Sequence, residues 1–241
     1  MHRFTGKQIC VTVFAVCLLG MHFLKRPLYM MLWGERSLNF STATGERFAD
    51  IGENLPWQNA RISGYDIQYR LRKKYKVCGR VVWVDWNDGV INTWYHSALR
   101  PTTKLYNAVA AVDVSIIHGD TSADGNWQKI KFNHEERGLM YNYTYADNPI
   151  VNSAEINNNH VIPASFAVRR ALAIIKKGEI AEFEGYLMDW KGTGKFADFE
   201  VETATYAGEL HSKQLYGGKV GAGLCRQFYV TKITVGGYTF E

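Results

Sequence analysis

The sequence predicts a mainly β protein with one α-helix, placed behind an N-terminal transmembrane helix. Three observations support this fold class. An uncharged apolar run opens the chain at residues 9–24, strand-like alternation begins at Tyr65 and recurs to the C-terminus, and one helical pattern stands out at residues 163–178. Of the 241 residues, 46% are hydrophobic and 14% aromatic, as expected for a chain that buries a core.

The N-terminus predicts a membrane anchor. A basic lead at residues 1–8 precedes the apolar run, and Lys25 and Arg26 close it. Sixteen helical residues span about 24 Å, and long basic side chains at both ends can extend that reach toward a ~30 Å bilayer core. We therefore expect an uncleaved single-pass anchor at residues 9–26. A cleaved signal peptide and a buried core helix are the alternatives.

The distribution of charge suggests the orientation of the anchor. The formal charge is +5, but five of the 28 basic residues and only one of the 23 acidic residues precede position 37. The chain from position 37 onward is therefore nearly neutral, and this argues against a nucleic-acid partner for the main domain. The positive-inside rule leans toward a cytoplasmic N-terminus, and hence toward a main domain outside the cytoplasm, in the periplasm.

The next segment, residues 27–64, is expected to be an interfacial stretch followed by a tether. Tyr29 and Trp33 are aromatic anchors of the kind found at membrane surfaces. Residues 37–64 are polar and turn-rich, without clear periodicity. The globular domain is therefore expected at residues 65–241.

The domain opens with β patterns. "YDIQYRLRKKYKVCGRVVWVDW" (65–86) predicts a long strand that bends at Gly79. "AVAAVDVSIIHG" (108–119) predicts another, with Val112, Val114 and Ile116 on one face. Residues 119–160 are polar and predict a long loop or an inserted subelement, which is more often functional than idle.

The predicted helix is "IPASFAVRRALAIIKKG", with Pro163 in its first turn and Gly178 as its C-terminal stop. Strands follow at residues 179–190 and 227–235, with a hairpin between them, and Gly185 marks a bend. The order strand, strand, strand, helix, strand, strand resembles an OB-like small β-barrel. A β-sandwich with one helix is the alternative.

Four cysteines divide into two pairs. Cys10 and Cys17 lie in the apolar run, where a thiol behaves as a small hydrophobic group. Cys78 and Cys225 lie in the domain, and a disulfide between them would suit an extracytoplasmic location. On the chain-entropy model, closing so long a loop would stabilise the fold by up to about 4–5 kcal/mol.

A catalytic interpretation of Cys225 remains open. "IIHGD" (116–120) and "GLCR" (223–226) are similar to the His-Gly and Cys-Arg segments of the L,D-transpeptidases, although Leu224 stands where that family has glycine. The resemblance implies that His118 activates Cys225 for attack on a cell-wall peptide. His160, in "NNNHVIPAS", is the other candidate base, or else a histidine that satisfies backbone groups beside the helix.

Several exposed positions are candidates for binding. Five basic residues crowd into "RLRKKYK", either as a contact surface or as a solvated sheet edge. Aromatic side chains on an OB-like face would add to such a surface. The candidate binding residues are Arg70, Arg72, Lys73, Lys74, Lys76, Trp127 and Tyr143. Neither metal-ligand spacing nor a cofactor motif is found in the sequence.

Together these patterns favour a membrane-anchored extracytoplasmic binding or scaffold domain, an accessory component of an envelope complex with a protein partner. A cysteine-dependent cell-wall peptide enzyme and a membrane-tethered nucleic-acid-binding domain are the alternatives. The oligomeric state and the identity of the partner are left open.

Overall fold

The computed structural model describes residues 24–36, 45–52, 55–88, 101–135, 137–197, 199–203, 213–215, 219–221 and 225–241. This part is mainly β, as the sequence predicted, with three helices. Most of the expected anchor at residues 9–26 lies outside the described residues. Among those described, no helix is long and apolar enough to cross a membrane.

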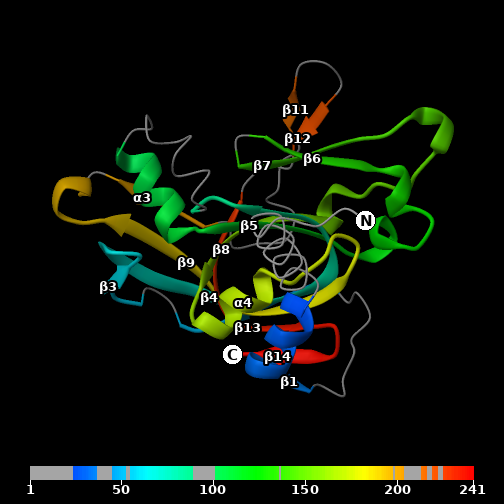
Figure 1. The fold of residues 1–241 in the computed structure, drawn as a ribbon. Coiled ribbons are helices and arrows are strands. Elements are labelled where there is room, and N and C mark those ends of the chain that lie inside the picture. The colour runs from blue at the N-terminus through cyan, green and yellow to red at the C-terminus, as the bar shows by residue number, and fades with distance from the viewer. Residues whose placement is uncertain are drawn as a thin grey trace, which may run out of the picture.

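Five strands pair in a closed ring, which is the centre of the fold (Figure 1). Each pairs antiparallel with its neighbours, except that β8 and β13 run parallel. In their order around the ring, the strands are β4 (Tyr65–Trp86), β5 (Val112–Ile117), β8 (Ile156–Pro163), β13 (Arg226–Val235) and β9 (Ile180–Gly192), which pairs back onto β4.

Shorter strands extend this sheet. Two of them, β2 (Gly45–Asp50) and β3 (Gln58–Ile62), pair with β4 and lie in the segment expected to be a tether. The 22-residue β4 is longer than either neighbour in the ring, so its backbone groups need these additional partners. The others are β1 (Glu35–Arg36), β10 (Glu200–Val201) and β14 (Tyr238–Phe240).

A second sheet occupies part of the region expected to be a polar loop. It contains β6 (Lys131–Glu135), β7 (Gly138–Asn142), β11 (Lys213–Leu215) and β12 (Lys219–Gly221). Phe132, Leu139 and Tyr141 are buried with Ile117 and Ile156 of the ring, and this apolar contact holds the second sheet in place. Four 3-10 turns complete residues 119–155, at Gly119–Ser122, Trp127–Lys129, Tyr145–Asp147 and Ser153–Glu155; a fifth, Gly194–Phe196, follows β9.

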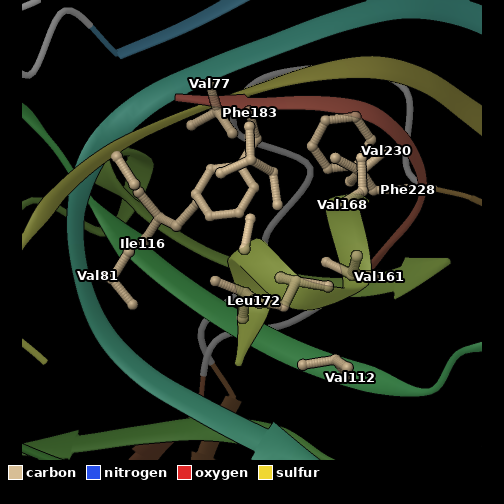
Figure 2. Close-up of a cluster of buried hydrophobic side chains, with 14 of the residues drawn as sticks. Val77, Val81, Val112, Ile116, Val161, Val168, Leu172, Phe183, Phe228 and Val230 are labelled. Carbon is tan, nitrogen blue, oxygen red and sulfur yellow. The ribbon is translucent and has the colours of Figure 1, made fainter. Parts of the chain in front are cut away.

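The main hydrophobic core fills the inside of the ring (Figure 2). The predicted face of Val112, Val114 and Ile116 is buried there, together with Phe183 of β9 and Phe228 of β13. At the predicted bends of β4 and β9, glycine is required by close backbone approach. A Cβ at Gly79 or Gly185 would collide with a carbonyl oxygen of the neighbouring strand.

The predicted helix is present but begins later. The helix α4 spans Phe166–Leu172, and the Ser165 hydroxyl caps it by accepting a 3.1 Å hydrogen bond from the Val168 backbone N–H. Pro163 ends β8 instead of starting the helix, so that prediction was wrong. Val168, Ala171 and Leu172 form the buried face of α4.

Two further helices were not predicted. The helix α3 (Pro101–Val109) packs Leu105 and Val109 on Trp190, outside the ring. Residues 24–33 form the other helix, which lies beside α4 and β14 in Figure 1.

Candidate active site

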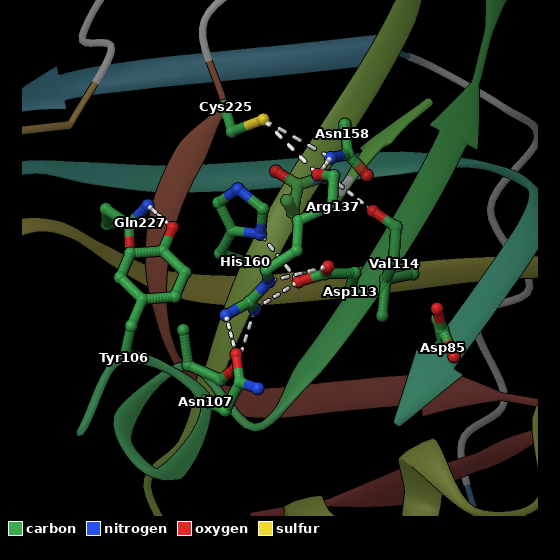
Figure 3. A network of polar contacts seen from close by, with 12 residues as sticks. Asp85, Tyr106, Asn107, Asp113, Val114, Arg137, Asn158, His160, Cys225 and Gln227 are labelled. Carbon is green, nitrogen blue, oxygen red and sulfur yellow. Dashed lines mark hydrogen bonds and ion pairs between the residues drawn. The ribbon is translucent and has the colours of Figure 1, made fainter. Parts of the chain in front are cut away.

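Polar side chains of β5, β8 and β13 gather on the outer face of the ring, together with Cys225 (Figure 3). The strand register places Asp113 and Gln227 on either side of His160, and Ser115 beside Asn158. Cys225 immediately precedes β13. Successive side chains of a strand point to opposite faces, so these groups face away from the core residues Val112, Val114, Val161 and Phe228.

His160 lies between a carboxylate and a thiol. Its Nδ1 is 2.5 Å from Oδ1 of Asp113, and on its other side the imidazole interacts electrostatically with the Cys225 thiol. Asp113 and His160 are buried, whereas Cys225 is half-buried. A nucleophile, a base and a group that orients the base are thus in the sequence of contacts used by cysteine and serine enzymes.

The electrostatics favour a charged pair. Burial works against charge on all three groups, but their mutual contacts outweigh it. Cys225 and Asp113 raise the pKa of His160 to about 9. The contact with His160 and a hydrogen bond from Asn158 lower the pKa of Cys225 below its ordinary value. Both shifts favour the pair of thiolate and imidazolium over the neutral pair of thiol and imidazole.

Arg137 holds Asp113 from the other side. Its Nη2 donates to Oδ1 at 2.7 Å and its Nε to Oδ2 at 3.1 Å. A further nitrogen donates to Asn107 of α3 at 2.9 Å, and the guanidinium lies 4.2 Å from the centre of the Tyr106 ring. Although burial raises it, contacts with His160 and Arg137 bring the pKa of Asp113 well below its usual range.

Asn158 contacts the sulfur directly. Its Nδ2 donates to Cys225 Sγ at 3.3 Å and to the backbone carbonyl of Arg137 at 2.9 Å, while its Oδ1 accepts from Ser115 at 2.9 Å. Both ends of the amide are fixed, so a donor always faces the sulfur. This arrangement stabilises negative charge on the thiol.

Tyr106 and Gln227 form a wall beside the imidazole. The Tyr106 ring meets His160 edge to face, with centroids 5.6 Å apart. Gln227 donates to the Tyr106 hydroxyl at 2.7 Å and accepts from the indole of Trp190 at 3.1 Å. These contacts fix the ring orientation and keep one side of His160 dry.

A second histidine stands behind Asp113. His134 Nε2 lies 3.6 Å from Asp113 Oδ2, and its Nδ1 lies 3.3 Å from the half-exposed Asp85. Burial lowers the pKa of His134 below its ordinary value, although both carboxylates oppose this effect. His134 is therefore mostly neutral at pH 7.

Between the two described cysteines, Cys78 and Cys225, the structure forms no disulfide. Cys78 is buried in the middle of β4, with Gly45 and Glu182 as its register partners on either side. The Cys225 thiol instead contacts Asn158, the Arg137 carbonyl and His160. The Cys78–Cys225 disulfide remains a prediction for chemical mapping.

His118 belongs to a different cluster. It follows β5 and lies against Gly45 of β2, and Glu155 is the acidic group whose charge affects the pKa of His118. The base that the structure brings to Cys225 is therefore His160.

The basic residues of β4 are set among acids. Arg70 and Arg72 pair with Asp189 at 2.9 and 3.5 Å, Lys73 with Asp50 at 3.4 Å, and Lys76 with Glu182 at 2.7 Å and Glu184 at 3.1 Å. Lys74 lies between Ala49 of β2 and Tyr186 of β9, so this stretch of β4 is not a sheet edge. The interpretation of these basic residues as a solvated sheet edge was therefore wrong.

The two candidate aromatic residues lie apart from the thiol site. Trp127 is half-buried beneath the Arg80 guanidinium, 5.2 Å from the ring centre. Tyr143 is 39% exposed and contacts Tyr145. Within the described ranges, no group of three or more His, Cys, Asp or Glu side chains could hold a metal ion.

Asp113, Arg137 and Asn158 of the candidate site escaped the sequence analysis. Asp113 was the one charged residue in a strand whose other residues, apart from Ser115, are apolar, which was a usable signal for a buried role. Arg137 and Asn158 lay in the expected loop and carried no comparable signal. Comparisons with protein-family models, curated proteins and solved structures give no significant match, so the site is interpreted from its own geometry.

Proposed function

We propose that this protein is a cysteine-dependent acyl-transfer enzyme, a hydrolase or a transferase, with Cys225 as nucleophile. The single observation that carries the proposal is the chain of contacts from Asp113 through His160 to the Cys225 thiol. A buried carboxylate, an imidazole of raised pKa and a thiol of lowered pKa in contact are the kind of perturbed groups that cluster at functional sites.

The chemistry follows from these positions. The Cys225 thiolate attacks an amide or ester carbonyl, and a carbon–sulfur bond forms. The His160 imidazolium gives its proton to the leaving amine or alcohol as the bond to the carbonyl carbon breaks. Neutral His160 then takes a proton from water or an acceptor amine, which attacks the thioester and releases Cys225. Asp113 keeps the imidazole oriented and stabilises its charge throughout.

The finer description of the fold is part of the proposal. We assign the ring to an OB-like barrel, since its strands in chain order run first, second, third, fifth, fourth, and α4 lies between the third and the fourth. In OB folds, ligands bind on the face of strands two and three and the adjoining loops. Asp113 and His160 lie on these two strands, β5 and β8, which supports a substrate site there.

Location and substrate class are proposed together. The apolar run at residues 9–26 supports a single-pass anchor, and its flanking charges favour an extracytoplasmic, periplasmic domain. Peptides of the cell wall are the acyl substrates that such a domain would meet, and are the class to test first.

The experiment is alkylation of Cys225 by iodoacetamide across pH 4–10, combined with turnover of cell-wall peptides. We expect rapid alkylation at pH 6, where an ordinary thiol is protonated. Cys225→Ala should abolish both this alkylation and the turnover of cell-wall peptides. His160→Gln should retain the thiol but slow its alkylation at pH 6 by about tenfold or more. Ordinary thiol behaviour of Cys225, with half-maximal reactivity near pH 8.5, would contradict the proposal.

An accessory binding domain is the second candidate. Tyr143, Tyr145 and Ile150 are exposed by 39%, 93% and 59% within one short segment, and such a patch suits a protein partner. Crosslinking from position 145 in native membranes tests it. If one partner is captured and Cys225→Ala leaves the phenotype unchanged, binding and not catalysis is the function.

A further inference from the structure

One side of the helix at residues 24–33 is apolar and exposed. Leu24, Leu28, Met31 and Leu32 are exposed by 63%, 45%, 73% and 53%. Their spacing of four, three and one residues places them on a single face of the helix. Stripes of large exposed apolar side chains usually mark an interaction surface.

The opposite side of this helix is fixed to the domain. The Tyr29 hydroxyl accepts a 2.9 Å hydrogen bond from Arg170 of α4, and Arg26 pairs with Glu179. Trp33 packs edge to face on Phe166, with ring centroids 5.6 Å apart. Tyr29 and Trp33 therefore face the protein, and the direction of the exposed stripe is set by the fold.

Phe166, which contacts Trp33 at the end of the helix, adds an exposed apolar side chain from a distant part of the chain. It begins α4, is 54% exposed, and lies beneath the Arg170 guanidinium at 4.2 Å. Figure 1 shows the helix of residues 24–33 beside α4. We call Leu24, Leu28, Met31, Leu32 and Phe166 the apolar surface.

Basic residues border the apolar surface. Lys176 and Lys177 are exposed just after α4, and the backbone N–H of Lys176 donates to Glu179 at 2.9 Å. Glu179 also pairs with Arg26, which brings these lysines near the start of the helix. Lys25 adds a further charge, 5.7 Å above the Tyr29 ring. An apolar stripe with a basic rim fits anionic lipid.

We propose that the apolar surface docks on an anionic lipid bilayer, so that the helix at residues 24–33 lies in the interface and α4 faces the membrane. The chain itself supports this occupant, because the uncharged apolar run at residues 9–24 leads directly into the stripe. The inference goes beyond the proposed function, since it fixes how the domain is oriented on the membrane and does not depend on Cys225.

The test uses the full chain in vesicles of equimolar phosphatidylglycerol and phosphatidylcholine with brominated acyl chains. A fluorescent amino acid is incorporated at position 31, 166 or 145, and quenching by the brominated lipid is measured. A tether alone could bring position 31 close to lipid, but not position 166, which is far away in sequence. We expect several-fold stronger quenching at positions 31 and 166 than at the exposed control position 145.

A variant set provides the matched control. The double substitution L28D/L32D should reduce quenching at position 166 to the level of position 145, whereas Y145D should leave it unchanged. Near-ultraviolet circular dichroism and Cys225 alkylation report whether each variant is folded, and an intact thiol site with lost docking separates this inference from the proposed function.

Other occupants of the surface would overturn the proposal. Position 166 unquenched by lipid but shielded from iodide, increasingly so at higher protein concentration, would indicate a second copy of the chain. Shielding that is independent of concentration would indicate coverage by another segment of the same chain. Position 166 quenched by iodide and not by lipid would show a surface without a partner.

Discussion

Asp113 and His160 face each other across adjacent antiparallel strands, with Oδ1 of one 2.5 Å from Nδ1 of the other. Their contact depends on register, because a slip of either strand by one residue would turn its side chain toward the core. The parallel pairing of β8 with β13 brings Cys225 to the other side of the imidazole. The properties of the thiol should therefore depend on a carboxylate that does not touch it.

The first prediction concerns that carboxylate. In Asp113→Asn, His160 loses its charged partner, and we expect Cys225 alkylation at pH 6 to slow by about tenfold or more and acyl transfer to fall at least about 100-fold. The pH profile of alkylation is the measurement. Asp124→Asn is the matched control, because Asp124 is exposed and pairs only at the surface with Arg80. Equal pH profiles of Cys225 alkylation in Asp113→Asn and Asp124→Asn would show that Asp113 does not influence the thiol.

The second prediction concerns the pKa of His160. Cys225 and Asp113 together raise this pKa to about 9. Cys225→Ala removes the larger of these two contributions, so the pKa should fall from about 9 toward the ordinary value of about 6.5. The chemical shift of the imidazole Cε1–H, followed against pH, measures it. An unchanged pKa would mean that the thiol and the imidazole do not interact.

A pH dependence of stability follows from the same shift. Because the folded pKa of about 9 lies above the unfolded value, the charged His160 contributes stability that is fully present below pH ~6.5 and is lost as pH rises through about 9. Urea unfolding at pH 6, 8 and 10 should show the wild type losing more stability over this interval than His160→Gln. An equal loss of stability in the wild type and in His160→Gln would contradict a charged His160.

The buried ion pair of Glu46 and Arg226 gives a stability prediction. Their charged atoms are 2.9 Å apart, and both side chains are nearly inaccessible. Glu46→Ala removes the carboxylate that pairs with the buried Arg226 guanidinium and should lower the free energy of unfolding by about 3–5 kcal/mol. Asp50, also on β2 and paired at the surface with Lys73, is the control, and Asp50→Ala should cost below about 1 kcal/mol. Similar losses in both would show that burial of the pair is not decisive.

Much of the framework could be predicted because it depends on local pattern. The strands β4 and β5 and the helix α4 follow from patterns in residues close in sequence. The strand β8 was missed because its centre reads "NNNH", which is typical of loops. The three asparagines are tolerated in a buried strand since each makes at least one hydrogen bond, to β5, to β13 or to Arg137.

The site itself was beyond local pattern. The sequence identified His160 and Cys225 as candidates, but it left three possible partners for Cys225, namely Cys78, His118 and His160. Which histidine reaches the thiol depends on the parallel pairing of β8 with β13, a contact between segments about 65 residues apart. The position of Arg137 depends on the path of the second sheet, and nothing in the local sequence predicts its left-handed backbone (φ 64°).

The last prediction decides between the two roles open to Cys225. As a nucleophile it must be free, and Cys78, buried between Gly45 and Glu182 on β4, should stay reduced as well. Peptide maps of the full chain, alkylated before lysis and compared with and without reductant, should show Cys225 modified quickly and Cys78 only after unfolding. Cys78→Ala is the control and should leave the reactivity of Cys225 unchanged. A peptide that links Cys78 to Cys225 would instead establish the disulfide, place the domain in an oxidising compartment, and leave His160 beside a sulfur that cannot attack.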